Sequence, residues 1–129
     1  MRAGWPGWSV EVSNKWSITD HAECLTLEWS EDGALQLSSA RKRIGEVSEN
    51  DLFFSMEDRL AWGSYSPVIC GEFEGIIYEY ELEGAAWRRW FLRNGATLLF
   101  VTYNGTPEAA VQERSAVEAV ISTARSEVT

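Results

Sequence analysis

Apolar and polar residues alternate with a period of two along most of the chain, a pattern typical of β-strands with one buried face. Short clusters containing glycine, asparagine or aspartate separate these runs and indicate turns. The predicted strands comprise residues 8–12, a brief extended piece at 16–18, two runs around Asp32-Gly33 within residues 23–40, and residues 68–73, 75–82, 85–92 and 96–103.

Two segments have helical spacing instead. Ser48 is a predicted N-cap with Asp51 three residues on, and the apolar residues that follow predict a helix over residues 49–61. Thr106-Pro107-Glu108 predicts the start of a second helix, because proline suits the first helical position. Its apolar stripe consists of Ala110, Val117, Val120, Ile121 and Ala124. The sequence therefore predicts an α+β domain in which a mainly antiparallel sheet of about six strands is flanked by two helices.

The dipeptide Asn94-Gly95 is a strong hairpin signal, because both residues tolerate positive φ. A two-residue turn there places Trp90 opposite Leu99. In the preceding hairpin, a turn at Gly84-Ala85 places Glu81 opposite Arg88. This pairing predicts that Arg88 is neutralised across the strands.

The first long hairpin has two alternative registers. One places Trp29 opposite Leu35 and Leu27 opposite Leu37, which brings the apolar faces together and leaves a five-residue loop or a bulge near Gly33. A tight turn at Asp32-Gly33 would put the apolar sets on opposite faces instead.

The last hairpins are apolar on both faces. One face is predicted to carry Tyr78, Tyr80, Leu82, Trp87, Phe91, Leu98 and Phe100, and the other Ile77, Trp90, Leu92, Leu99, Val101 and Tyr103. A sheet that is apolar on both sides needs cover on both sides. The alternatives are helices on opposite faces, the N-terminal segment, or a second subunit in a homodimer.

Two groups of residues are candidates for binding. A pocket beside the sheet could be lined by Glu79, Glu81, Arg88 and Trp90. The seven tryptophans could also form a contact surface. We expect Trp29, Trp87 and Trp90 in the core, whereas Trp5, Trp8 and Trp62 become the contact site if they cluster on the surface.

Composition narrows the classes of function. The 129 residues suit one domain, and 20 acidic against 11 basic residues give a net charge of −9, which disfavours nucleic-acid binding. No run is long and apolar enough for a membrane span, and the N-terminus lacks a signal-peptide pattern, so we expect a cytoplasmic protein. Cys24 and Cys70 are expected to be reduced thiols, with a disulfide as the alternative.

The residue patterns assign no catalytic residue, cofactor or metal. The single histidine lies in "TDHAEC", where adjacent residues seldom converge on a metal or a triad, so a polar loop is expected. Phosphate-loop, dinucleotide and zinc motifs are missing. The basic residues 41–43 are too few for a nucleic-acid stripe and are expected in a solvated loop or at a strand end.

The order of elements, with the passage "ATLLFVTYNGTPE" from sheet into helix, resembles the PsbP-like or DcrB-like fold, whose superfamily includes the Mog-type Ran-binding import factor. The resemblance spans most of residues 10–125. It implies a sheet with helices on both faces, and an accessory, chaperone-like or protein-binding role. It assigns no site residues.

The leading prediction is therefore a small acidic accessory domain that binds a protein partner. The alternative is an enzyme or a binder of small ligands that uses a pocket beside the sheet.

Overall fold

The computed structural model describes residues 1–21, 23–55 and 65–127. Within these ranges the elements are, in chain order, β1 (Arg2–Trp5), β2 (Gly7–Glu11), β3 (Ser17–Asp20), β4 (Leu25–Ser30), β5 (Gly33–Arg41), α1 (Glu49–Ser55), β6 (Tyr65–Cys70), β7 (Phe73–Leu82), β8 (Ala85–Asn94), β9 (Thr97–Gly105), α2 (Pro107–Ile121) and β10 (Arg125–Glu127). The order of strands, helix, strands and helix confirms the α+β class.

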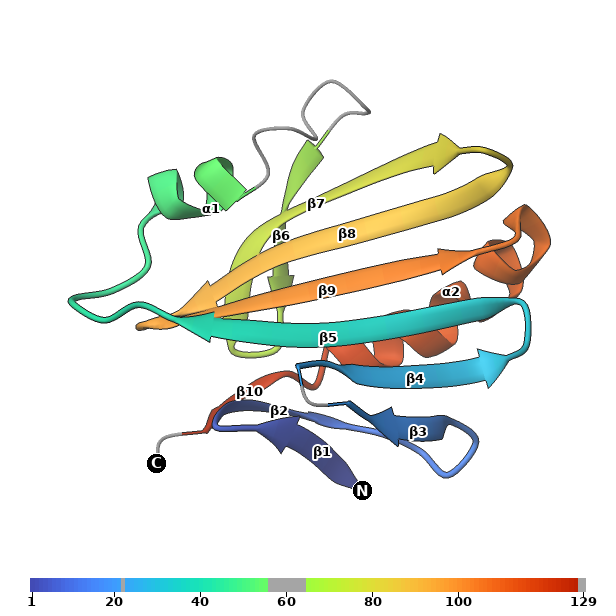
Figure 1. Ribbon diagram of the computed structural model, residues 1–129, viewed down its shortest axis with the longest axis horizontal. Helices are drawn as coiled ribbons and strands as arrows, with labels where there is room; N and C mark the ends of the chain where they lie inside the picture. The colour runs from blue at the N-terminus through green and yellow to red at the C-terminus, as the bar shows by residue number, and fades with distance from the viewer. Residues whose placement is uncertain (22, 56–64, 128–129) are drawn as a thin grey trace.

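The described strands form two antiparallel sheets (Figure 1). The main sheet has seven strands in the order β3-β4-β5-β9-β8-β7-β6, and a small sheet has three in the order β1-β2-β10. The predicted count of about six strands was therefore too low. The strands that the sequence did not predict are β1 and β10, which pair with β2 on either side and complete the small sheet.

The turns of the long hairpins lie one residue away from their predicted positions. Glu83 and Gly84 have φ values of 51° and 82°, so the turn precedes Ala85. Leu82 pairs with Ala85, and Glu79 instead of Glu81 lies opposite Arg88. Two consecutive positive φ values are the requirement of a type I′ turn, and glutamate at the first position is tolerated here.

The turn of the final hairpin is also displaced by one residue, but towards the C-terminus. Asn94 pairs with Thr97, so the turn consists of Gly95 and Ala96, with a φ of 56° at Gly95. Glycine with positive φ at the first central position is typical of a type II′ turn. Trp90 consequently lies opposite Val101, instead of the predicted Leu99.

The β4–β5 hairpin follows neither predicted register. Leu27 pairs with Leu35 and Ser30 with Gly33, with a bulge between Leu27 and Ser30. The two-residue turn is Glu31-Asp32, and the bulge keeps the leucines of both strands on one face. It also removes Trp29 from the regular alternation of β4.

Both helix starts are confirmed. The Ser48 hydroxyl accepts a hydrogen bond from the Asp51 amide at 3.1 Å, and the Asp51 carboxylate accepts one from the Ser48 amide at 2.8 Å, a reciprocal capping box. Thr106 caps α2 by accepting a hydrogen bond from the Ala109 amide at 3.1 Å. Helix α1 is described as far as Ser55, and the predicted remainder to residue 61 lies outside the described residues.

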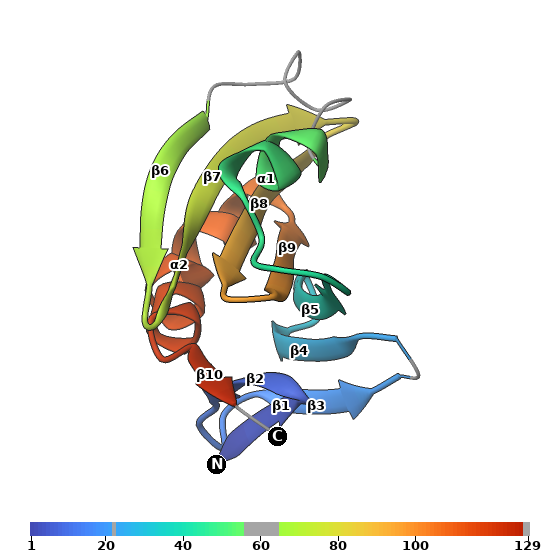
Figure 2. The same cartoon turned by 90° about the vertical axis from the view of Figure 1, so that its left-hand side faces the viewer.

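The main sheet is curved, and its two faces have separate cores (Figure 2). Helix α2 and the small sheet close the concave face, where Trp8, Trp90 and Leu99 belong to one buried cluster. Helix α1 lies on the convex face, over a second cluster that includes Tyr78 and Phe91. The predicted division of side chains between the faces is confirmed, and helices and the N-terminal segment of this chain provide the cover.

Candidate functional site

Arg88 is the most buried charged side chain of the predicted site. It points from β8 to the concave face, and its residue is 5% exposed. Its Nε lies 3.1 Å from Glu79 Oε1, and its Nη2 donates a hydrogen bond to Glu118 Oε1 on α2 at 3.1 Å. Burial lowers the pKa of Arg88, and the two glutamates oppose that effect.

A second arginine completes the ion cluster. Arg114 Nη1 lies 3.0 Å from Glu79 Oε1, and its Nε lies 3.5 Å from Glu118 Oε1. The hydrogen bond to Glu79 raises the pKa of Arg114. Two guanidinium groups and two carboxylates thus balance each other, which makes the cluster a clamp between α2 and strands β7 and β8.

Arg88 and Trp90 also border a cavity of about 330 Å³ between α2 and the edge of the sheet at β6. The guanidinium carbon of Arg88 lies 4.6 Å from the centre of the Trp90 ring, a cation–π contact. Cys70 lines the same cavity, and burial raises the pKa of its thiol to about 11. Cys70 is a free thiol, as is Cys24, which confirms the expectation of reduced cysteines.

The structure brings three of the predicted pocket residues together and separates the fourth. Glu79, Arg88 and Trp90 are in contact, whereas Glu81 lies opposite Ala86 and is exposed. The predicted pair of Glu81 with Arg88 is therefore wrong, because the turn at 83–84 shifts the register by two residues.

The predicted tryptophan contact site is also corrected. Trp8 is fully buried in the concave core, and Trp5 is part-buried opposite it on β1. Trp62 lies outside the described residues. Trp29, which was expected in the core, is 38% exposed. Trp29 lies within the bulge of β4, where it has no register partner on β5, and it borders a groove on the α2 side instead of packing inside the leucine cluster.

Trp29 borders a groove that the sequence patterns did not reveal. Trp16 meets the Trp29 ring edge-on at a centroid distance of 5.3 Å, and Lys15 Nζ lies 5.8 Å from the same ring. The groove has a volume of about 660 Å³ and runs between these residues and α2, where Ala116 and Ala119 form the opposite wall. The small side chains of α2 were visible in the sequence, but their position opposite a bulged strand was not.

In the part of the chain that the structure describes, no group of three histidine, cysteine, aspartate or glutamate side chains is placed to hold a metal ion. Across residues 1–21, 23–55 and 65–127, no helix has the length and apolar character to cross a membrane.

Solved structures are similar to this chain in fold. A protein from Bacteroides thetaiotaomicron VPI-5482 matches 98% of this chain at 15% identity and a TM-score of 0.71. The match covers 48% of that protein, so this chain spans about half its length. LpqN from Mycobacterium tuberculosis, described as involved in cell envelope biogenesis, matches 98% of this chain and 89% of its own at 13% identity and a TM-score of 0.61.

A weaker similarity is that to PsbP from the cyanobacterium Synechocystis sp. PCC 6803. It covers 98% of this chain and 92% of that one, at 8% identity and a TM-score of 0.48. This likeness is one of fold alone, and the DcrB-like and Mog-type parts of the predicted resemblance have no counterpart among these three structures. No protein-family model matches the sequence, and no curated protein matches it significantly.

Proposed function

We propose that this chain is a non-catalytic accessory domain that binds a protein partner in the Trp16–Trp29 groove. One observation carries the proposal: a part-exposed tryptophan borders an apolar cavity of about 660 Å³. Tryptophan is enriched among the residues that contribute most to binding at protein interfaces, above all beside a packed pocket. An apolar side chain of the partner would fill the space between Trp29 and α2.

The charge of the chain suggests which partner fits. The net charge is −9, and the strands next to the groove expose Asp20 and Glu28. Long-range attraction therefore favours a partner segment whose apolar anchor is flanked by lysine or arginine. The same charge disfavours nucleic acid.

The proposal includes a relationship of this chain to the DcrB-like and Mog-type members of the superfamily. DcrB-like and Mog-type members of the superfamily act as accessory, chaperone-like or protein-binding modules, and a groove for a peptide segment suits such a role. A cytoplasmic location belongs to the same proposal. Neither assigns a particular partner.

Photo-crosslinking in the native host tests the groove. The full chain would carry benzoylphenylalanine at Asn14, an exposed residue that lines the groove, or at Val111, which is 78% exposed on α2 and does not line it. A discrete adduct is expected from position 14 and not from position 111. Trp29→Ala should abolish the adduct, because it removes the proposed anchor.

The affinity of the purified partner for the chain and its variants measures how much Trp29 contributes to binding. Trp29→Ala should weaken binding by roughly tenfold or more, since truncation of an anchor residue commonly costs 2 kcal/mol or more. Val111→Ala serves as the matched control and should leave binding unchanged. An adduct at position 14 that persists in Trp29→Ala at full yield would contradict the proposal.

A small-ligand site beside Arg88 is the second candidate function. The cavity of about 330 Å³ favours it, because the volume is at the lower end of the range for ligand pockets. A ligand there would shield the Cys70 thiol from modification and leave Cys24 as an internal standard. Methyl methanethiosulfonate labelling during a screen of small metabolites, read by peptide mass spectrometry, tests this; labelling of Cys70 that no compound slows would contradict it.

A further inference from the structure

The three arginines of strand β8 differ in how their charges are compensated. Arg88 contacts Glu79 and Glu118, and Arg93 lies 3.2 Å from Glu74 and donates to the Val47 carbonyl. Among the described residues, no carboxylate lies within ion-pair distance of Arg89, and its Nε has no hydrogen-bond partner. An uncompensated cation is unusual in a chain with 20 acidic residues.

The surroundings of Arg89 are aromatic. The side chain lies on the convex face, opposite Thr102 on β9, and its guanidinium carbon is 5.6 Å from the centre of the Trp87 ring. On the other side of Arg89 along β8, Phe91 and Phe100 meet edge to face at 6.0 Å. The cation thus lies over the Trp87 ring, in a half-buried position where water screens its charge less than at an open surface.

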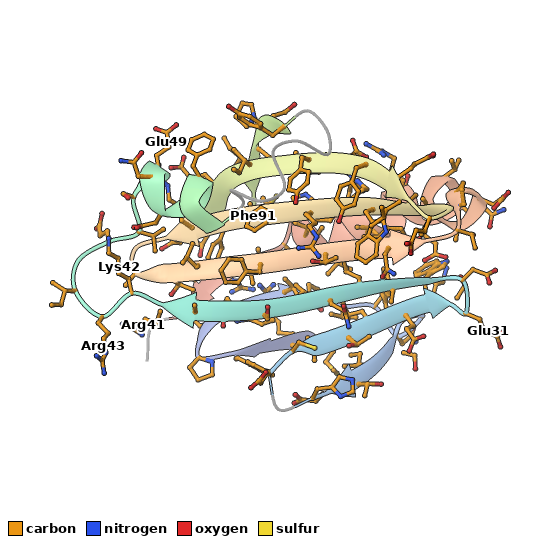
Figure 3. The ribbon with its side chains drawn as sticks, turned by 45° about the horizontal axis from the view of Figure 1, so that its top comes forward. Glu31, Arg41, Lys42, Arg43, Glu49 and Phe91 are labelled. Atoms are coloured by element: carbon orange, nitrogen blue, oxygen red, sulfur yellow. The ribbon has the colours of Figure 1, made fainter. Side chains whose placement is uncertain are left out.

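A hollow of about 510 Å³ lies beside the cation. Its lining includes Arg89, Phe91, Phe100, Ser38 and Thr102. The two hydroxyl groups can each donate a hydrogen bond, and the phenylalanine rings supply an apolar floor. Figure 3 shows Phe91 on this face, away from Arg41 at the end of β5 and from Lys42 and Arg43, which follow it.

We propose that this hollow binds a small monoanion with a planar apolar body, such as an aryl or indolyl carboxylate. The carboxylate pairs with Arg89, whose fork of donors matches two oxygens, and the hydroxyls of Ser38 and Thr102 meet the remaining lone pairs. The ring of the ligand lies against Phe100, since Phe91 is only 6% exposed and stacks on Tyr78. A phosphate dianion fits less well, because a single cation would leave one negative charge uncompensated in an acidic protein.

This inference is independent of the proposed protein-binding function. The Trp16–Trp29 groove lies on the α2 side of the main sheet, and Arg89 lies on the α1 side. A ligand in the hollow would not touch the groove, so either site can fail its test without affecting the other.

The test compares two probes with the same ring and nearly the same shape. Indole-3-acetate and indole-3-acetamide would be titrated into the ¹⁵N-labelled full chain, with binding followed through amide chemical shifts. The acetate should bind at least about tenfold more tightly than the acetamide, because a charge-assisted pair with arginine is the stronger interaction. The largest shifts should fall on residues 38, 89, 91, 100 and 102.

Variants separate the role of Arg89 from general attraction. Arg89→Gln should bring the affinity for the acetate to within about twofold of the affinity for the acetamide. Arg89→Lys should keep part of the preference, since it retains the charge without the fork. Arg41→Gln, an exposed position at the end of β5, is the matched control and should leave the preference unchanged.

Several results would overturn the proposal. Equal affinity of the unmodified chain for both probes would do so, and this comparison does not depend on whether a variant folds. So would a preference that Arg89→Gln leaves intact, or shifts that centre on residues 41–43. Shifts at the hollow on concentrating the protein without a probe would assign it to self-association instead.

Discussion

The two faces of the main sheet are built from the same strands, yet they are covered in different ways. On the concave face, α2 and the small sheet enclose a continuous buried cluster. On the convex face, α1 covers a smaller cluster, and Trp87 and Phe100 remain part-exposed. Arg88 and Arg89 are consecutive residues of β8, but they point to these different environments.

The difference shows that two arginines in neighbouring positions acquire different interactions because the elements packed over them differ. Under α2, Arg88 meets two glutamates because a buried charge without partners would be strongly destabilising. Arg89 is nearer to solvent and can remain without a carboxylate. We therefore expect stability to depend mostly on the concave face, and binding of the aryl carboxylate to use Arg89 on the convex one.

The largest expected effect is the loss of a large side chain from the concave core. Trp8→Ala should lower the free energy of unfolding by about 3–5 kcal/mol, because Trp8 is 0% exposed and connects the small sheet to the main sheet. Phe100→Ala on the convex face should cost about 1–2 kcal/mol, since part of its ring already faces solvent. Urea unfolding measures both, and equal losses would contradict the asymmetry.

The arginine pair sharpens the comparison. Arg88→Met should lower the free energy of unfolding by about 2 kcal/mol, less than a fully buried ion pair would lose, because Glu79 and Glu118 are about half exposed and retain Arg114. Arg89→Met removes no ion pair and should cost under about 0.5 kcal/mol. Chemical denaturation of the two variants side by side checks the difference. A larger loss for Arg89→Met would reverse the assignment of their roles.

The division of side chains between these faces was predictable, although the hairpin registers were not. Moving a turn from Asn94-Gly95 to Gly95-Ala96 changes the partner of Trp90 by two residues, from Leu99 to Val101. Because side chains alternate with a period of two, a shift of two leaves every residue on its predicted face. The alternation of apolar residues therefore survives an error that changes individual pairs.

The candidate sites depended on features that local patterns do not contain. The partner of Arg88 changed from Glu81 to Glu79 through the same shift, and its second partner, Glu118, is 30 residues away in the chain on α2. The exposed Trp29 lies in a bulge, and β4 contains no glycine or other turn-forming residue that would have predicted that bulge. Contacts between distant elements and an irregular strand thus account for what sequence reasoning missed.

A smaller effect is expected from the cap of α2, the helix that covers the concave face. Thr106→Ala should lower the free energy of unfolding by about 1 kcal/mol, because the amide of Ala109 loses its acceptor. Thr106→Ser keeps the acceptor and is the matched control. Thermal unfolding would show a lower melting temperature for the alanine variant alone, and an equal decrease in both would point to the methyl group instead.

The smallest expected effect concerns pH and the cap of α1 on the convex face. Hydrogen bonds from Lys42 and Ser48 lower the pKa of Asp51 to about 2. Because this pKa is below the ordinary value near 3.8, the carboxylate stabilises α1 above about pH 4 and loses that contribution as the pH falls towards 2. The hydroxyl cap of α2 does not titrate in this range, so the two helices should respond differently to acid.

Carbon chemical shifts of residues 49–53 and 107–121, followed from pH 6 to pH 2, would measure that difference. The helical shifts of α1 should decrease between about pH 4 and pH 2 while those of α2 persist. Asp51→Asn removes the titrating group, and its α1 shifts should be independent of pH over the same range. If both helices instead lose their shifts together at one pH, acid acts on the whole fold, and the cap of α1 is not its most acid-sensitive part.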